Sequence, residues 1–323
     1  MSDSEPDTVL KVDNLSISYQ TRQGKVKAAE DVTFEVKAGQ FVGLSGESGC
    51  GKTTTALSIM HLLPKEGVVE KGSILFKEED ILQYDKKEVQ EYLWRDVSMI
   101  FQGAMNALNP VHKVIDQMVT AIRIHEDVSK QEARQRSLEL IDSVGIDVSR
   151  ADGYPHEMSG GMKQRLMIAL ALVCHPSLVI ADEPTTALDV MVQAQIMDLL
   201  RQLRQRTSLS VLLITHDLSV LAETCDHIII MYAGRIAEAG DKRTVFTAPE
   251  HPYTMKLISS FPSVLADKGI DYIPGNPPDL INPPSGCRFH PRCQYAIEKC
   301  RREQPPLEDE NGHRVACWRR HDI

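Results

Sequence analysis

The stretch GESGCGKTTT, which begins at Gly46, constrains the fold of this chain more than any other feature. It matches the pattern G-x-x-x-x-G-K-[ST] and lies between the apolar run FVGLSG and a helical pattern. Glycines at this spacing let the backbone curl, so that successive N–H groups and the positive helix end face a phosphate. We expect Lys52 to reach the β- and γ-phosphates and the Thr53 hydroxyl to bind Mg²⁺. An ordinary glycine-rich turn is the alternative, and the order of strand, motif and helix disfavours it.

The pattern of apolar residues predicts an α/β protein with two kinds of strand. Residues 15–19 and 32–36 alternate in the manner of half-buried, antiparallel strands. Three later apolar runs, FVGLSG, SLVIAD and VLLITH, are each followed by a helical pattern, which predicts a parallel sheet covered by helices. Residues from about 103 to 174 are mainly helical and are predicted to form a helical insertion.

The character of the chain changes near residue 248. Before it, Ala233-Gly234 is expected to form a hairpin turn. After it, the prolines of HPY, IPGNPPDL and NPPSG favour an extended, wrapping segment over regular structure. We therefore predict one domain over residues 1–248 and an extension over residues 249–323.

Charge and hydropathy restrict the location and partners of the chain. The net charge of −9 argues against binding to a nucleic-acid backbone. The longest apolar runs, such as LMIALALVC, are about half of the ~18–20 residues that cross a bilayer. The start, MSDSEPDTVL, has the character of neither a secretory signal nor a transit peptide. We expect a cytoplasmic protein that takes any membrane role through a partner.

A pair of acidic residues ends the apolar run of LVIADEP. In phosphoryl transfer, one carboxylate at such a position can hold Mg²⁺ through its water shell, and the next can position the attacking water. Asp182 is the candidate for the first role and Glu183, as general base, for the second. Because a strand that ends in acidic residues is common, Asp182 and Glu183 indicate a phosphoryl-transfer site only together with other motifs.

Four further motifs supply that support. Ser159 can cap a helix that begins at Gly160 and Gly161, which makes a second anion-binding helix start. The others are single polar residues at the end of a strand or in a turn: Gln102, Asp189 and His216.

In this order and spacing, the motifs resemble those of the ATP-binding subunits of ABC transporters, over about residues 9–248. The resemblance implies a P-loop NTPase fold with an antiparallel β subdomain, a RecA-like parallel-sheet core, a helical subdomain and a small irregular C-terminal extension. It implies an ATPase that binds ATP and Mg²⁺ at a dimer interface.

The same resemblance implies a role for each motif residue. Tyr19 would stack on adenine, Asp189 would lie at the dimer seam, and Ser159-Gly160-Gly161 would close over ATP held by the facing subunit. The catalytic residues would be Glu183, His216 at the γ-phosphate, and Gln102. Mg²⁺ would be bound by Thr53, Gln102 and Asp182. The ATP-binding loop would comprise Gly46, Ser48, Gly49, Cys50, Gly51, Lys52, Thr53 and Thr54. The chain departs from the usual pattern in MSGGM, in place of LSGGQ, and in the Gly-Ala that follows Gln102, in place of Asp-Pro.

APEHPYTMKLISSFP, IPGNPP and the cysteine-bearing tail resemble the C-terminal extension of oligopeptide/dipeptide importers. This resemblance implies a second ATPase subunit, usually a different chain, two transmembrane permease subunits and, indirectly, an extracytoplasmic substrate-binding protein. The cargo would be peptides, with oligosaccharides or nickel as alternatives.

Two other functions are weighed against import. A soluble ABC-type ATPase acting on nucleic acid or ribosomes would carry two cassettes in one chain or a long coiled coil. This chain has one phosphate-loop motif, at Gly46, and one Ser159-Gly160-Gly161 motif, and only residues 47–158 lie between them. An exporter ATPase would have no use for the importer-like tail.

Four of the seven cysteines lie in the final 37 residues with the spacing C-x5-C-x6-C-x16-C: Cys287, Cys293, Cys300 and Cys317. A disulfide framework is disfavoured in a reducing compartment. An iron–sulfur cluster is the preferred hypothesis, as related importers carry such a motif; zinc, which favours tight C-x2–4-C pairs, and metal-free thiols are the alternatives. A [4Fe-4S] cluster would pin the tail to the rest of the protein. Cys50, in the phosphate loop, is either a reactive thiol or a small residue chosen to fit.

Overall fold

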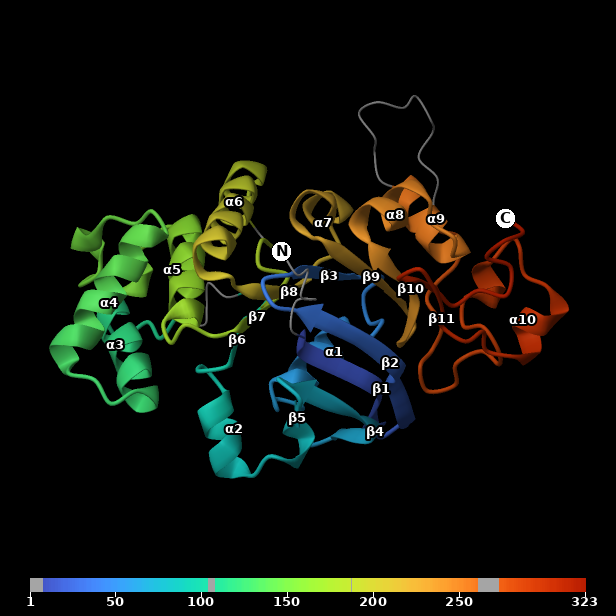
Figure 1. Ribbon diagram of the computed structural model, residues 1–323, viewed down its shortest axis with the longest axis horizontal. Coiled ribbons are helices and arrows are strands. Elements are labelled where there is room, and N and C mark those ends of the chain that lie inside the picture. Colours follow the sequence, from blue (N-terminus) through green and yellow to red (C-terminus); the bar gives the residue numbers. More distant parts are fainter. Residues whose placement is uncertain (1–7, 104–107, 187, 261–272) are drawn as a thin grey trace, which may run out of the picture. The chain divides into compact units, whose positions relative to one another are not determined.

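The structure is a computed structural model that describes residues 8–103, 108–186, 188–260 and 273–323 (Figure 1). The chain divides into two compact units. The first consists mainly of residues 83–213, and the second of residues 10–35, 40–82 and 214–323. Ala104, Ala187 and residues 261–272, on which parts of the predicted motifs and of the extension fall, lie outside the described residues.

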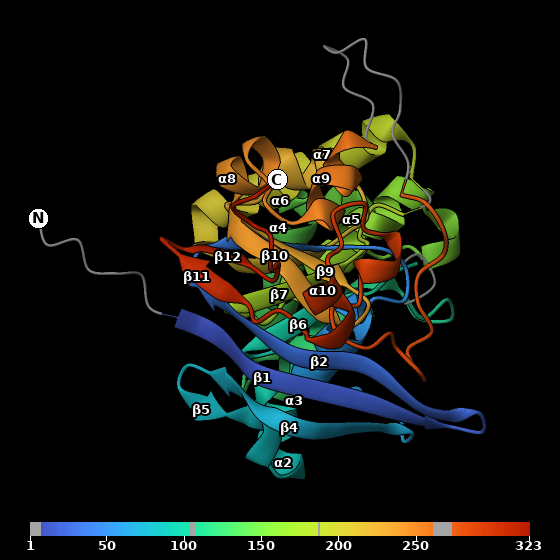
Figure 2. The same ribbon diagram turned by 90° about the vertical axis from the view of Figure 1, so that its right-hand side faces the viewer.

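An antiparallel sheet forms one part of the second unit, and Figure 2 shows β1, β2 and β4 side by side. In order across the sheet, its strands are β2 (Gly24–Lys37), β1 (Thr8–Thr21), β4 (Gly67–Phe76) and β5 (Glu79–Asp80). The register between β1 and β4 pairs Leu10 with Phe76 and Val12 with Ile74, and all four side chains are buried. Residues 15–19 and 32–36 thus lie on neighbouring strands of this sheet, as predicted, and the pairing of β1 with β4 is antiparallel.

The second unit also contains the strand that leads into the phosphate loop. This strand, β3 (Phe41–Ser45), is buried along its whole length and is followed by α1 (Lys52–Ile59). It pairs in parallel with β9 (His227–Tyr232), which pairs antiparallel with β10 (Arg235–Asp241). Ala233 and Gly234 both have positive φ, as expected for a two-residue hairpin turn, so the predicted turn is confirmed.

The C-terminal extension has more regular structure than the sequence predicts. Its described elements are α9 (Pro252–Ser259), α10 (Glu298–Arg302), β11 (Glu308–Glu310) and β12 (His313–Val315). β12 pairs with β10, which gives the order β11-β12-β10-β9-β3. The expectation of an extended segment holds for residues 273–289, which contain no helix or strand. It is wrong at α9, because Pro252 occupies the first turn of a helix, where a missing N–H costs nothing, and at β12, where His313 binds the buried Glu238 at 2.7 Å.

The first unit combines parallel strands with helices. β6 (Val97–Ile100) pairs in parallel with β7 (Leu178–Asp182), and the N–H of Ser210, at the start of β8 (Ser210–Ile214), donates to the carbonyl of Ser177. The helices of this unit are α2 (Lys86–Tyr92), α3 (Val114–His125), α4 (Lys130–Ser143), α5 (Gly160–Leu172) and α6 (Val190–Thr207). The described part of the predicted helical insertion, which contains α3, α4 and α5, is therefore confirmed as helical.

Short helices complete the chain. Two further α-helices of the second unit are α7 (Leu218–Thr224) and α8 (Lys242–Thr247). The described residues also form the 3₁₀ helices η1 (Ile81–Gln83), η3 (Val148–Arg150), η4 (Pro155–Glu157) and η5 (His290–Arg292). Among the described residues, no helix combines the length and the apolar character that crossing a membrane requires.

Candidate functional site

The loop between β3 and α1 has the conformation that only glycine allows. Gly46, Gly49 and Gly51 have φ values of 147°, 77° and 104°. A Cβ on Gly46 would lie 2.0 Å from the carbonyl oxygen of Met231, and one on Gly51 would lie 2.3 Å from that of Ala28. The loop is therefore packed closely against the backbone of β9 and β2, and Gly46 and Gly51 are required for that approach.

The lysine of this loop points back along it. Lys52 is 7% exposed, and its Nζ donates hydrogen bonds to the carbonyl oxygens of Gly46 at 2.7 Å and Glu47 at 3.0 Å. An ammonium group is thus placed inside the curl where phosphate oxygens would be bound, as expected for this motif. Thr53, the predicted Mg²⁺ ligand, is exposed at the start of α1.

Two further candidates lie at the phosphate loop: Cys50 is part of it, and Tyr19 contacts α1, which follows it. Cys50 is buried, and burial raises the pKa of its thiol, which favours the interpretation of a small residue chosen to fit over a reactive thiolate. The Tyr19 hydroxyl donates to Thr54 Oγ1 at 3.2 Å. A Cβ on Gly67 would lie 2.9 Å from the Tyr19 ring, so glycine at that position leaves room for the ring.

The predicted base and the predicted glutamine meet in the first unit. Asp182 ends β7 and is 2% exposed, and Glu183 follows with a φ of 46°. Glu183 Oε2 accepts hydrogen bonds from Gln102 Nε2 at 2.7 Å and from Thr186 Oγ1 at 3.0 Å. Two donors therefore hold the Glu183 carboxylate in one orientation. One of them, Thr186, was missed by sequence reasoning.

The signature helix is capped as the sequence predicts. The Ser159 hydroxyl accepts the N–H of Met162 at 3.3 Å, and α5 begins at the next residue. Further along α5, the buried Gln164 side chain donates to the carbonyl of Pro184, which follows Glu183 directly. Sequence reasoning missed this link between the signature helix and the acidic turn.

Two remaining candidates lie at helix starts or strand ends. Asp189 caps α6 through its hydrogen bond to the N–H of Val192 at 2.9 Å. His216 is exposed and follows β8. Tyr19, His216 and the phosphate loop belong to the second unit, and the other candidates of the ATP site belong to the first.

The four C-terminal cysteines line one small cavity of about 20 Å³, together with aromatic residues that include Phe289 and Trp318. Burial, with smaller contributions from the other thiols, raises the pKa of Cys287 to about 12 and that of Cys317 to about 11. The thiol of Cys317 accepts the N–H of Arg319 at 3.4 Å, two residues along the chain. Cys287 and Cys293 accept the N–H groups of Phe289 and Tyr295 in the same way.

The fit of these thiols to a metal centre is mixed. Within the described ranges, no group of three or more His, Cys, Asp or Glu side chains is arranged to hold a metal ion. The donor set, in contrast, is that of iron–sulfur and zinc sites, and N–H groups directed at sulfur are typical of metal-bound thiolates. The shared cavity brings the four thiols together, but it does not by itself establish a ligand set.

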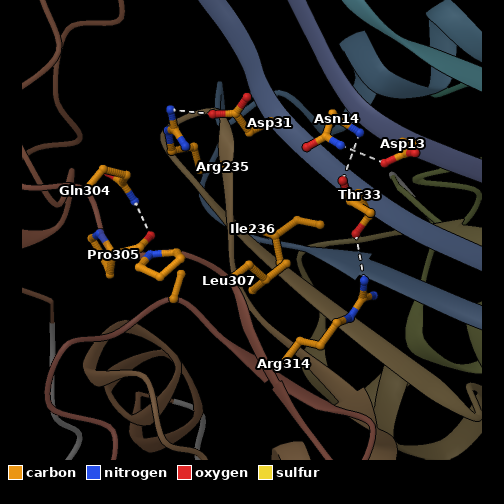
Figure 3. A pocket seen from close by; sticks show the side chains of 12 residues that line it. Asp13, Asn14, Asp31, Thr33, Arg235, Ile236, Gln304, Pro305, Leu307 and Arg314 are labelled. Carbon is orange, nitrogen blue, oxygen red and sulfur yellow. Dashed lines mark hydrogen bonds and ion pairs between the residues drawn. The ribbon is translucent and has the colours of Figure 1, made fainter.

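A larger pocket, of about 620 Å³, lies in the second unit and is lined by residues other than those predicted to bind ATP (Figure 3). Its polar wall is held together internally, because Arg235 pairs with Asp31 at 2.9 Å and Arg314 donates to the carbonyl of Thr33 at 3.0 Å. We assign it no part in nucleotide binding.

Comparison with known proteins matches both parts of the chain. Residues 29–186 match the family described as ABC transporter, and residues 237–300 match the family described as oligopeptide/dipeptide transporter, C-terminal region. The dipeptide transport ATP-binding protein DppD of Bacillus subtilis is 45% identical over 96% of this chain and 94% of that relative. The oligopeptide transport ATP-binding protein OppD of Escherichia coli is 43% identical over 99% of this chain and 95% of that relative.

A solved structure gives the same result for the fold. The dimeric, post-hydrolysis structure of the ATP-binding cassette MJ0796, with ADP and Pi, has a TM-score of 0.65 and 27% sequence identity. The matched region covers 72% of this chain and 99% of that cassette.

Proposed function

Because this chain belongs to the family of ATP-binding subunits of ABC transporters, we propose that it powers the import of peptides through a membrane permease. Its family makes it an ATPase, and the P-loop fold class predicted from the sequence is confirmed. The observation that carries the proposal is the close packing of the glycine loop around Lys52, combined with the transporter-type C-terminal region. Residues 1–248 would form the motor and residues 249–323 the importer-specific extension.

The chemistry follows from the residues of the loop and the acidic turn. Loop N–H groups and Lys52 would bind the phosphates of ATP, with Mg²⁺ held by Thr53, Gln102 and Asp182. Glu183, oriented by Gln102 and Thr186, would accept a proton from the water that attacks the γ-phosphorus. The products are ADP and phosphate. Tyr19 would hold adenine, and His216 would contact the γ-phosphate.

The site would be completed by a second subunit. Ser159, Gly160 and Gly161 at the start of α5 would close over ATP bound to the facing chain, with Asp189 at the seam. We expect that facing chain to be a different ATPase. We further expect both to dock on two permease subunits at the cytoplasmic face of the membrane and to receive cargo from an extracytoplasmic binding protein.

Peptides are the favoured cargo because of the names of the relatives and of the C-terminal family. Oligosaccharides and nickel are the alternatives that the resemblance leaves open. Co-purification of the tagged chain from its native membranes tests the assignment. We expect two permease proteins and a second ATPase to be recovered, whereas recovery of ribosomes or nucleic acid instead would contradict it.

The isolated chain is expected to hydrolyse ATP slowly, because each site needs the signature residues of a facing subunit. Adding the second ATPase and the permease should raise turnover, as measured by phosphate release. Fast, cargo-responsive hydrolysis by the purified monomer would contradict this arrangement.

We also propose that Cys287, Cys293, Cys300 and Cys317 hold an iron–sulfur cluster. The four thiols line one cavity, and backbone N–H groups are directed at three of them, as is typical of metal-bound thiolates. The cluster would cross-link residues that are distant in sequence and so stabilise the extension.

Anaerobic purification tests the cluster. We expect brown protein with absorption near ~400 nm and about four irons per chain for a cubane cluster. The combined replacement of Cys293 and Cys300 by Ser should remove the iron, and Cys174→Ser, a buried cysteine of the first unit, serves as the matched control. Colourless protein with one zinc per chain, or iron that survives the double replacement, would overturn the proposal.

A further inference from the structure

The segment CRFHPRC, residues 287–293, contacts the predicted phosphate loop through Arg292. Its Nη1 and Nη2 atoms donate to the two carboxylate oxygens of Glu47, the second residue of the loop, at 2.7 and 2.9 Å. The Arg292 side chain is 7% exposed and that of Glu47 is 22% exposed. A two-pronged ion pair that is shielded from water in this way is stronger and more directional than an exposed one.

Arg292 is itself fixed by groups on its other side. Its Nη1 also donates to the Tyr232 hydroxyl at 3.1 Å, and its Nε donates to the carbonyl of Pro274 at 2.7 Å. Burial alone would lower the pKa of Arg292, but its hydrogen bonds to Glu47 and Tyr232 raise it above its usual range. The guanidinium is therefore a permanently charged, rigidly held partner for the loop.

Tyr253 holds the backbone of the same loop residue. This side chain of α9 is fully buried, and its hydroxyl oxygen accepts the N–H of Glu47 at 2.9 Å. Its ring packs against those of Tyr232 and Phe289, with centroids 4.6 and 5.5 Å away. Phe289 belongs to CRFHPRC, so this segment supports both the side chain and the backbone of Glu47.

Arg288 supports the far end of the loop through the turn between β9 and β10. It donates to the carbonyl of Ala233 and pairs with Glu30 at 2.5 Å. The N–H of Gly234 in that turn donates to the carbonyl of Cys50 at 2.9 Å. The N–H of Glu30 donates in turn to the carbonyl of Gly234 at 2.8 Å. The turn is thus fastened to Arg288 on one side and to the phosphate loop on the other.

We propose that Arg292 and Arg288 are positioning residues for ATP binding, which brace the two ends of the phosphate loop without touching the nucleotide. A loop held in its binding conformation loses less conformational freedom when ATP binds, so the brace raises affinity. The proposal rests on the nucleotide site proposed above. Because Cys287 directly precedes Arg288 and Cys293 directly follows Arg292, whatever holds these two thiols also holds the brace.

Equilibrium binding of radiolabelled ATP to the full-length chain tests the brace. We expect Arg292→Gln and Glu47→Gln each to raise the Kd for ATP about tenfold, and the double variant to be no weaker than either single one, because both act through one pair. Arg302→Gln is the matched control, since Arg302 lies in the same extension and pairs with the exposed Glu298, whereas the pair of Arg292 is shielded from water. Its Kd should stay within about twofold of wild type.

A purely structural role for Arg292 predicts a different pattern. In that case Arg292→Gln would lower the melting temperature while leaving the Kd for ATP within about twofold of wild type, and that result would overturn the proposal. Lys52→Ala separates this failure from failure of the site itself. If Lys52→Ala abolishes ATP binding and Arg292→Gln does not weaken it, the site stands and the brace is refuted.

Should Arg292→Gln fail to fold, Arg292→Lys keeps the charge and loses only the two-pronged geometry. We then expect about three- to fivefold weaker ATP binding and faster amide hydrogen exchange in residues 46–53. Unchanged exchange in those residues would refute the brace.

Discussion

Replacing Glu183 with Gln is expected to lower ATP turnover of the assembled transporter by ~10²–10⁴-fold, the usual cost of losing a positioned general base. The glutamine oxygen can still accept from Gln102 and Thr186, so the local geometry should be kept. ATP binding should therefore be preserved, and the ATP-bound dimer should accumulate. Phosphate release and size-exclusion chromatography in the presence of ATP measure the two effects.

Asp198→Asn is the matched control for this change. Asp198 is an exposed carboxylate on α6 that accepts a hydrogen bond from Gln202, one turn along the same helix, so its loss should leave turnover unchanged. Turnover of Glu183→Gln within about threefold of wild type would contradict the assignment, since that corresponds to less than ~1 kcal/mol of barrier.

Replacing Gly46 with Ala is expected to weaken ATP binding by about 100-fold or more. The new Cβ would lie 2.0 Å from the Met231 carbonyl oxygen, and the φ of 147° is nearly exclusive to glycine. The loop must move away from β9 to relieve the overlap, which changes the direction of its N–H groups. The Kd for radiolabelled ATP measures the loss.

Gly312→Ala separates backbone strain from displacement of the loop. Gly312 also has positive φ, at 82°, but a Cβ there would have no heavy atom within 4 Å. We expect a stability cost of about 1–2 kcal/mol and an unchanged Kd for ATP. ATP binding by Gly46→Ala within about threefold of wild type would show that the loop does not hold the nucleotide.

The features that the sequence predicted correctly depend on neighbours along the chain. The apolar run before Gly46 and the glycines after it determine strand, loop and helix in that order. Ser159 caps α5 through an N–H only three residues away, and Ala233-Gly234 joins two strands that are adjacent in the sequence. Such local rules need no knowledge of the rest of the fold.

The features that escaped prediction depend on residues that are distant in sequence. Glu47 and Arg292 lie 245 positions apart, and nothing local to either residue identifies its partner. β12 is three residues long and without apolar alternation, and it forms because the edge of β10 and the buried Glu238 are available to it. The one signal in the sequence is the pair of arginines beside Cys287 and Cys293.

Peptide-dependent ATP hydrolysis by the complete complex in proteoliposomes tests most directly whether this chain drives peptide import. The complex would be purified with its permease and second ATPase and supplied with the extracytoplasmic binding protein and a mixture of di- to pentapeptides. We predict that turnover rises when peptide-loaded binding protein is added and is lost when this chain carries Glu183→Gln. ATP hydrolysis that does not change when peptide is added, or that continues unchanged with Glu183→Gln, would contradict the proposed function.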